Sequence, residues 1–513
     1  MNWDQGYVVD APYTYGYYSE LAPVRADFAS LLAGHAGIPD GPCCELGFGQ
    51  GVSLCVNAAA DRSRQWWGND FMPEHVRFAR SLADAAGLDA ILSDQSFEEF
   101  CARDDLPQFA FIALHGIWSW ISPRDQAVIV DFLRRKLMVG GVAYLSYNTL
   151  PGWTTMAPLR HLFNEYARSA LPPATSPVER MRAALGFVEG LLATNPAYVR
   201  HNPEISKRLA KLRTSPPEYL PHEYLNAEWH LPTFAEMSRS LADAKLTYVG
   251  PALLSDRVDV LHLTDEQRRL LDGIADPVLR ETTRDVLIDQ PFRRDYWVKG
   301  ESRVRPGAQR ETLNAQSFVP SVPASRAPTT IFGARGESSL QAAIYEPLTA
   351  FLHESVAPVS WAQIVATMGS KHGLREGQIA QAIALLVSQG ALHPVQPAER
   401  AQASAESVRR LNERLAQALT QDARTSVLAS AVTGTGISVP LASQLFIDAV
   451  RRGAKTPAEC AQSAWKALQP QGIRLTVEGR QLETPRENLA ELEKRAREYR
   501  SVDEPIYRRL GIA

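Results

Sequence analysis

The stretch Glu45-Leu46-Gly47-Phe48-Gly49-Gln50-Gly51 decides the fold of the first part of the chain. It follows an apolar run that begins at Pro42, and it precedes a helical pattern over 52–60. Glycines at alternate positions allow a tight turn and a close approach of the backbone to a ligand at a helix N-terminus. A phosphate-binding loop would need Gly-Lys-Ser/Thr, and a dinucleotide turn would space its glycines as GxGxxG. The turn therefore disfavours phosphate transfer, and its context decides what it binds.

Short apolar runs alternate with helical patterns on either side of this turn. The expected strands cover 42–45, 65–69, 90–92, 109–114 and 142–147, and the expected helices cover 52–60, 73–86 and 124–137. Strands that alternate with helices of this length predict parallel βαβ units and an open α/β sheet.

Acidic side chains stand at the ends of three of these strands. Glu45 precedes the first glycine, Asp70 follows the second strand, and Asp94 closes the third strand with Gln95 and Ser96 beside it. A carboxylate at the position of Asp70 can accept hydrogen bonds from both hydroxyls of a ribose, as in dinucleotide-binding folds. Three acidic residues at three strand ends indicate a nucleoside-binding edge.

The ExGxGxG turn resembles that of the class I S-adenosylmethionine (SAM) methyltransferases, which have a Rossmann-like sheet. The resemblance implies that SAM is the cofactor and that the turn holds its methionine part, with the cationic amine and the sulfonium. It also implies that the second strand end binds the ribose and that the third contacts the adenine. The cofactor-binding residues expected on this basis are Glu45, Gly47, Gly49, Gly51, Asp70, Asp94, Gln95 and Ser96.

Four further segments narrow the resemblance to bacterial methyltransferases that carry a methyltransferase regulatory domain. Segment 146–153 (SYNTLPGW) resembles their signature, and 114–120 (LHGIWSW) resembles their fourth-strand motif. Segment 219–226 (YLPHEYLN) resembles the start of the regulatory domain, and 292–295 (FRRD) resembles its end. The resemblance covers about residues 10–300. Rickettsial lysine methyltransferases that act on outer-membrane proteins have a similar plan, which suggests protein lysine as the substrate.

Methyl transfer from a sulfonium requires a neutral nucleophile aligned with the methyl group, so positioning supplies much of the rate. An aromatic pocket favours the neutral form of an amine and accommodates methylammonium products. Tyr147 and Asn148 lie on the strand-end motif expected to face the methyl group, and Trp118 and Trp120 are candidates for the pocket wall. His115 is a candidate general base because an imidazole titrates near neutral pH.

Each of these residues also has a purely structural interpretation. Tyr147 and Trp120 also fit a role as core aromatics, Asn148 fits a turn, and His115 fits a hydrogen-bonded structural histidine. The N-terminal tyrosines fit either a lid over the cofactor cleft or ordinary packing. These tyrosines are Tyr7, Tyr13, Tyr15, Tyr17 and Tyr18.

The pair His222-Glu223 does not predict a metal site. An HExxH zinc motif would place histidine at 226, where the chain has Asn226.

The composition is typical of a globular enzyme and excludes several classes. Of 513 residues, 45% are hydrophobic and 22% are charged, and 54 basic residues against 57 acidic ones give a net charge of −3. Wholesale disorder and a membrane bundle are excluded on this basis, and a nucleic-acid partner is not favoured. The five cysteines include no CxxC pair, which fits a reducing compartment. With no signal peptide and no uninterrupted apolar span, we expect a cytoplasmic protein.

The pattern changes along the chain predict four parts. They are a SAM-binding domain with an N-terminal lid (1–157), a mostly helical middle regulatory domain (158–300), a linker rich in Arg, Pro, Ser and Thr (301–338), and a helical, winged-helix-like C-terminal domain (339–513). The predicted function is methylation of protein lysine side chains. Two alternatives stay open, a small-molecule O- or N-methyltransferase and a SAM-binding regulator without catalysis. Substrate identity, methylation degree and oligomeric state are left open.

Overall fold

A computed structural model describes residues 7–10, 15–172, 174–418 and 425–513. Its centre is a seven-stranded sheet in the order β3-β2-β1-β4-β5-β7-β6. The strands are β1 (Cys43–Leu46), β2 (Trp66–Asn69), β3 (Ile91–Ser93), β4 (Phe109–Leu114), β5 (Leu137–Asn148), β6 (Leu246–Pro251) and β7 (Phe292–Lys299). The first five strands run parallel, and β7 is antiparallel to both of its neighbours. This mostly parallel sheet confirms the predicted α/β class.

Helices cover both faces of the sheet, which explains the continuous apolar sequence of its central strands. All six residues of β4 are buried, as expected for a parallel strand that is covered on both sides. The flanking helices are α1 (Pro23–Leu32), α2 (Val52–Ala60), α3 (Pro73–Ala86), α4 (Phe97–Cys101) and α5 (Pro123–Lys136). Every residue of α2 is buried, because the C-terminal helix α18 (Ala398–Ala418) packs over α2 and α3.

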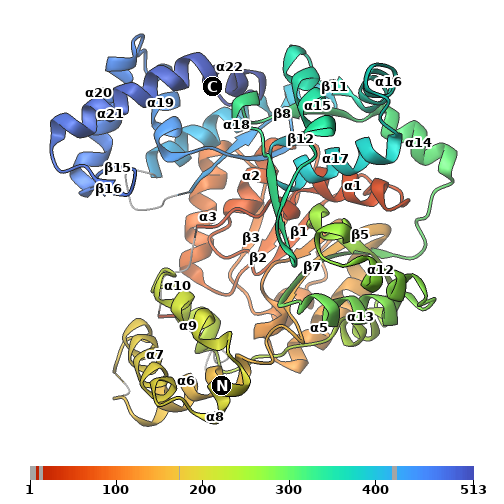
Figure 1. Cartoon of the computed structure of the whole chain (residues 1–513), viewed down its shortest axis with the longest axis vertical. Coiled ribbons are helices and arrows are strands. Elements are labelled where there is room, and N and C mark those ends of the chain that lie inside the picture. Colours follow the sequence, from red (N-terminus) through yellow and green to blue (C-terminus); the bar gives the residue numbers. More distant parts are fainter. Residues whose placement is uncertain (1–6, 11–14, 173, 419–424) are drawn as a thin grey trace.

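The middle part of the chain divides between the sheet and a helical lobe. Strands β6 and β7 lie within the predicted middle domain, yet they complete the sheet beside β5. The helices before β6 have their own apolar core, with Phe163 and Met181 at its centre, and they form the yellow lobe at the bottom of Figure 1. The lobe consists of α6 (Ala157–Ser169), α7 (Pro177–Ala193), α8 (Ala197–His201), α9 (Ile205–Arg213) and α10 (Tyr219–Tyr224). The chain then passes through α11 (Phe234–Ala242), α12 (Asp265–Asp272) and α13 (Pro277–Ile288).

The segment 301–338 is not the linker that its composition predicts. It contains α14 (Pro306–Ala315), β8 (Ser317–Pro320), β9 (Thr330–Gly333) and β10 (Gly336–Ser339). Several apolar residues among its Arg, Pro and Ser residues are buried, including Phe318, Val319 and Ile331. Strand β8 is the central strand of a three-stranded sheet with β11 and β12. Composition misleads here because a short strand needs only two or three apolar side chains to join a core.

The C-terminal part packs directly on the sheet domain and shares its main apolar core. Three short helices and two short strands come first in this part, and more helices follow in blue in Figure 1. The elements are α15 (Ala342–Glu354), β11 (Val359–Ser360), α16 (Trp361–His372), α17 (Glu376–Ser388), β12 (Leu392–Val395), α18, β13 (Val427–Ser430), β14 (Thr435–Ser438), α19 (Leu441–Arg451), α20 (Pro457–Leu468), β15 (Thr476–Val477), β16 (Arg480–Gln481), α21 (Pro485–Glu498) and α22 (Glu504–Arg509).

All five cysteines are buried and carry free thiols. Within the ranges that the structure describes, no helix combines the length and the apolar character needed to cross a bilayer.

Candidate functional site

A cavity of about 360 Å³ opens at the carboxyl ends of β1 to β4, a size within the range of small-molecule sites. Its wall comes from the loops that follow the strands, because the carboxyl ends of parallel strands meet at one edge of the sheet. Tyr7 of the N-terminal segment adds to this wall. The predicted cofactor residues in the lining are Gly47, Gly49, Asp70, Asp94, Gln95 and Ser96. Glu45 and Gly51 do not line the cavity.

The glycine turn has the backbone conformation that its sequence predicts. Gly47 and Gly49 have φ values of 69° and 56°, in the left-handed region that favours glycine. A Cβ atom on Gly47 would lie 2.3 Å from Cδ1 of Ile117, which also lines the cavity. At Gly51 a Cβ atom would lie 2.5 Å from Ala79 of α3, so this glycine serves helix packing.

Asp70 joins the turn to the end of β2. Its carboxylate accepts hydrogen bonds from the N–H groups of Gly49 (2.8 Å) and Met72 (3.0 Å), and Nδ1 of His75 lies 3.0 Å away. A carboxylate offers about four acceptor positions, so capacity remains for a ligand hydroxyl. The sequence analysis missed His75, although its place on the buried face of α3, five residues after Asp70, is a usable signal.

Glu45 lies beneath the turn as a buried carboxylate with an unused oxygen. Its side chain is 3% exposed, and its Oε2 atom has no hydrogen-bond partner among the described residues. Burial, and secondarily the charge of Asp70, raise the pKa of Glu45 to about 8. A buried carboxylate without a partner is costly, and a cationic ligand group held by the turn would supply the missing charge.

The residues after β3 divide between ligand-facing and structural roles. Asp94 is exposed at the cavity. Asn69 holds the backbone of Gln95 with two hydrogen bonds, of 2.8 and 3.2 Å, while the side-chain oxygen of Gln95 has no partner in the described chain. Ser96 caps α4, since its hydroxyl bonds both the N–H and the carboxylate of Glu99. Asp94 and Gln95 therefore present the polar groups that a ligand can use.

The motif after β4 places one tryptophan in the cavity and one in the core. Trp120 lines the cavity, and the guanidinium of Arg160 lies 5.9 Å from its ring centroid. Trp118 is buried in the apolar core.

His115 is held in place by its neighbours. Its Nδ1 atom lies 2.8 Å from the Tyr144 hydroxyl, and its ring stacks on Tyr18 at 3.6 Å between centroids. Burial lowers the pKa of His115 to about 4, so the ring is neutral and weakly basic at pH 7. The histidine does not line the cavity, and this geometry favours the structural interpretation.

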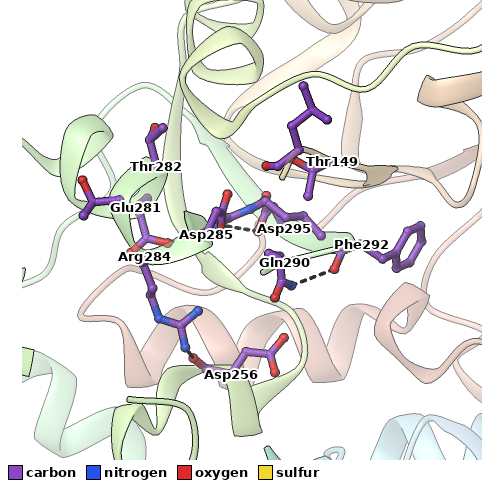
Figure 2. Close-up of polar contacts among 12 residues, drawn as sticks. Thr149, Asp256, Glu281, Thr282, Arg284, Asp285, Gln290, Phe292 and Asp295 are labelled. Carbon is purple, nitrogen blue, oxygen red and sulfur yellow. Dashed lines mark hydrogen bonds and ion pairs between the residues drawn. The ribbon is translucent and has the colours of Figure 1, made fainter. Parts of the chain in front are cut away.

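Tyr147 and Asn148 project from opposite faces of β5, because side chains alternate along a strand. The Tyr147 hydroxyl donates to Asp295 at 2.8 Å. Figure 2 shows Asp295 beside Asp285 in a group of polar contacts. Asn148 is buried at the end of β5, where its N–H donates to Ser119. Neither residue lines the cavity.

The centre of the Tyr147 network is the buried guanidinium of Arg293. It pairs with Asp285 at 2.6 Å, Asp295 at 2.8 Å and Glu281 at 3.1 Å. Burial raises the pKa of Asp285 to about 7, partly offset by the charge of Arg293. The network joins β7 to α13 through ion pairs.

The N-terminal tyrosines connect the cavity to the rest of the chain. The ring of Tyr7 packs against Phe71 and His222, at 5.8 and 5.6 Å, and the neighbouring N–H of Val8 donates to Asn226. The Tyr17 hydroxyl bonds Thr435 in the C-terminal part. Tyr13 lies outside the described residues. The segment lies against both the cavity and the helical lobe, as a lid would.

No group of three or more His, Cys, Asp or Glu side chains in the described ranges is arranged to hold a metal ion.

Comparisons with known proteins agree with this architecture. The family model of a predicted methyltransferase regulatory domain matches residues 216–299. The chain is 35% identical to the uncharacterized protein sll1526 of Synechocystis over the full length of both, and 27% identical to RP028 of Rickettsia prowazekii over 35% of this chain and 71% of that protein. The structure of PKMT2 from Rickettsia typhi in complex with AdoHcy superposes with a TM-score of 0.70 at 16% identity, over 97% of this chain and 99% of the other. That likeness shows a shared fold along nearly the whole chain.

Proposed function

The chain belongs to the class I SAM-dependent methyltransferases that carry a methyltransferase regulatory domain, and on this premise we propose that it methylates lysine side chains of proteins. The proposal rests on the edge of the cavity, where the glycine turn lies beside two carboxylates. They are Glu45, which is buried with an unused oxygen, and Asp70, which can accept a ribose hydroxyl. Glu45 would balance the cationic methionine part of SAM, and Asp70 would accept the ribose hydroxyls. Asp94 and Gln95 would contact the adenine.

SAM supplies a methyl group activated by its sulfonium. The chain must then hold a neutral acceptor in line with that methyl group and exclude water from it. Trp120, Tyr7 and Phe71 give the cavity an aromatic wall, which suits an amine and its methylated products. This wall, together with the resemblance to lysine methyltransferases, favours an amine acceptor.

The size of the non-catalytic part favours a protein acceptor. The helical lobe and the region after β10 lie outside the sheet, and neither contributes a described residue to the cavity wall. For α15 to β12 we propose a winged-helix-like arrangement, because helices and short strands follow one another in that order. The net charge of −3 gives no reason to assign this region to nucleic acid, so we propose that it contacts the protein substrate.

The test is transfer of labelled methyl groups to a bacterial cell extract by the full-length chain. We expect label in protein, and peptide mass spectrometry should locate it on lysine. Label in the organic extract alone would instead support a small-molecule methyltransferase. Binding of SAM in calorimetry without any transfer would support a non-catalytic regulator.

A further inference from the structure

Glu223 is a carboxylate of the regulatory domain without a strong counter-ion. It lies on α10, and the hydroxyl of Tyr219, one helical turn earlier, donates to it at 2.6 Å. Its side chain is partly exposed, and within the described parts of the chain no cation lies within 4 Å of it. Burial raises the pKa of Glu223. The carboxylate therefore has one hydrogen bond and room for a partner.

The cation that acts on Glu223 is already engaged elsewhere. Arg160 of α6 lowers the pKa of Glu223 by its charge, but its guanidinium donates to the Asn226 carbonyl at 2.6 Å. The same guanidinium lies 4.4 Å from the ring centroid of Trp229. Arg160 thus favours the ionised form of Glu223 without bonding to it directly.

Phenol groups lie near the carboxylate, and the hydroxyl of Tyr219 bonds it directly. Burial raises the pKa of Tyr7, Tyr219 and Tyr224, and the charge of Glu223 raises each of them further. Tyr18 also contributes to the raised pKa of Tyr7 and Tyr219. Two of these tyrosines come from the N-terminal segment and two from the helical lobe. A carboxylate among aromatic rings is the chemistry that recognises alkylammonium groups.

This group of residues adjoins the proposed cofactor cavity. Tyr7 lines the cavity together with Asp70, and its ring packs on His222, the neighbour of Glu223. On the other side, Trp120 lines the cavity and faces Arg160. Helix α10 lies on the side of the lobe that is turned toward the sheet (Figure 1). A long side chain that enters the cavity past Tyr7 would pass close to α10, the helix that carries Glu223.

We propose that Glu223, framed by Tyr7, Tyr18 and Tyr219, binds the ammonium group of the acceptor lysine and takes its proton before methyl transfer. This inference rests on the proposed function and gives the regulatory domain a direct part in it. Glu223, whose pairing with His222 does not form a zinc motif, thereby acquires a role.

The proposed step balances as follows. The lysine ammonium gives one proton to the Glu223 carboxylate, which becomes a neutral carboxylic acid, and the amine becomes neutral. The amine lone pair then forms the N–C bond to the methyl carbon while the S–C bond breaks and its electron pair stays on sulfur. The products are a methylated ammonium and the neutral thioether S-adenosylhomocysteine, and Glu223 later loses its proton to water.

The test compares Glu223→Gln with Glu218→Gln, which removes an exposed carboxylate just before the same helix. In the first arm, initial rates of methyl transfer to lysine in extract protein are measured at saturating SAM. General acid–base roles contribute at least about a hundredfold, so we expect a loss of that order in Glu223→Gln and none in Glu218→Gln. Melting temperature and SAM affinity should stay at wild-type values in both variants. Tyr219→Phe, which removes only one donor, should lose less activity than Glu223→Gln.

The second arm does not depend on the natural substrate. With S-adenosylhomocysteine bound, n-butylammonium and n-butanol are titrated into each protein and followed by NMR. We expect the wild type and Glu218→Gln to bind the ammonium in preference to the alcohol, and Glu223→Gln to bind it roughly tenfold or more weakly, as for the loss of a desolvated ion pair. The low-pH limb of the rate profile should also flatten in Glu223→Gln. The groups that remain around the amide are Tyr7, Tyr219, Tyr224 and Arg160, and none of them titrates at low pH.

The two arms separate failure of the inference from failure of the proposed function. Lysine transfer at the wild-type rate by Glu223→Gln would overturn the inference and leave the function intact. If the wild type methylates no lysine, the proposed function fails, and the butylammonium titration decides whether Glu223 is an amine site. Absence of butylammonium binding in the wild type, or equal binding in Glu223→Gln, would overturn the inference.

Discussion

Two groups of buried and half-buried carboxylates lie near the carboxyl end of the sheet, and they differ in the positive charge available to them. Where β7 meets α13, Asp285, Asp295 and Glu281 share the guanidinium of Arg293. On the cavity side, Glu45 has an unused oxygen and Glu223 has a tyrosine as its hydrogen-bonding partner. The same chemical group is thus supplied with a cation by the chain in one place and left without one in the other. The first group holds the fold together, and the second is suited to receive positive charge from a ligand.

The largest expected effect comes from removing the internal cation. Arg293→Met should lower the free energy of unfolding by about 3–5 kcal/mol, because it leaves the buried carboxylates of Asp285 and Asp295 without their partner. The matched control is Arg280→Met, whose ion pairs are longer and partly exposed, and which should cost less than about 1 kcal/mol. Denaturant unfolding of both variants measures the difference. Equal stability of the two variants would mean that the Arg293 network does not hold β7 to α13.

On the cavity side, the expected loss is in binding rather than in stability. Asp70→Ala should weaken SAM binding by about 1.5–3 kcal/mol, the range for hydrogen bonds to a charged group. The control is Asp89→Ala, an exposed aspartate that pairs with Arg62 on the surface. Calorimetric titration gives both affinities. If Asp70→Ala binds SAM as tightly as Asp89→Ala does, the assignment of the ribose site to this cavity is wrong.

Glu45 tests whether a buried carboxylate without a counter-ion in the described chain binds a cationic group of the ligand. Its pKa in the folded chain is raised to about 8, above its value in the unfolded chain. The folded state therefore binds more protons than the unfolded state between these values, and stability falls as the pH rises through this window.

Glu45→Gln should accordingly stabilise the ligand-free protein at pH 8 by on the order of 1–3 kcal/mol, since one pKa unit corresponds to 1.36 kcal/mol and relaxation reduces the full shift. The gain should shrink as the pH falls and vanish below about pH 4, under the usual pKa of an unfolded-chain glutamate. SAM binding to the wild type at pH 7 should release protons, which calorimetry in buffers of different ionisation enthalpy detects. A pH-independent gain, or no proton release, would contradict the proposed contact with the cationic part of SAM.

The sequence predicts the sheet and the cavity edge better than it predicts the acceptor side. Apolar runs and glycines are local signals, so the strands from 43 to 148 and the positions of Gly47, Asp70 and Asp94 follow from short windows. Strands β6 and β7 join the sheet only after a long helical excursion, and nothing local in 158–300 says so. The partners of Tyr147 and Glu223 are likewise set by long-range packing. Asp295 lies 148 residues from Tyr147, and Tyr7 meets α10 only in the folded chain.

The smallest expected effect discriminates between the two roles of Tyr147. If its hydroxyl oriented the nucleophile, as the strand-end motif suggests, Tyr147→Phe would slow turnover by roughly a hundredfold. The geometry instead gives that hydroxyl a fixed partner, Asp295, which also forms an ion pair with Arg293. We therefore expect Tyr147→Phe to cost about 1 kcal/mol of stability, the net value of one hydrogen bond, and to leave SAM affinity and turnover within a few-fold of wild type. Denaturation and label transfer on the same preparation measure both quantities. A large loss of turnover at unchanged stability would return Tyr147 to the catalytic site and would mean that the carboxylates paired with Arg293 take part in methyl transfer.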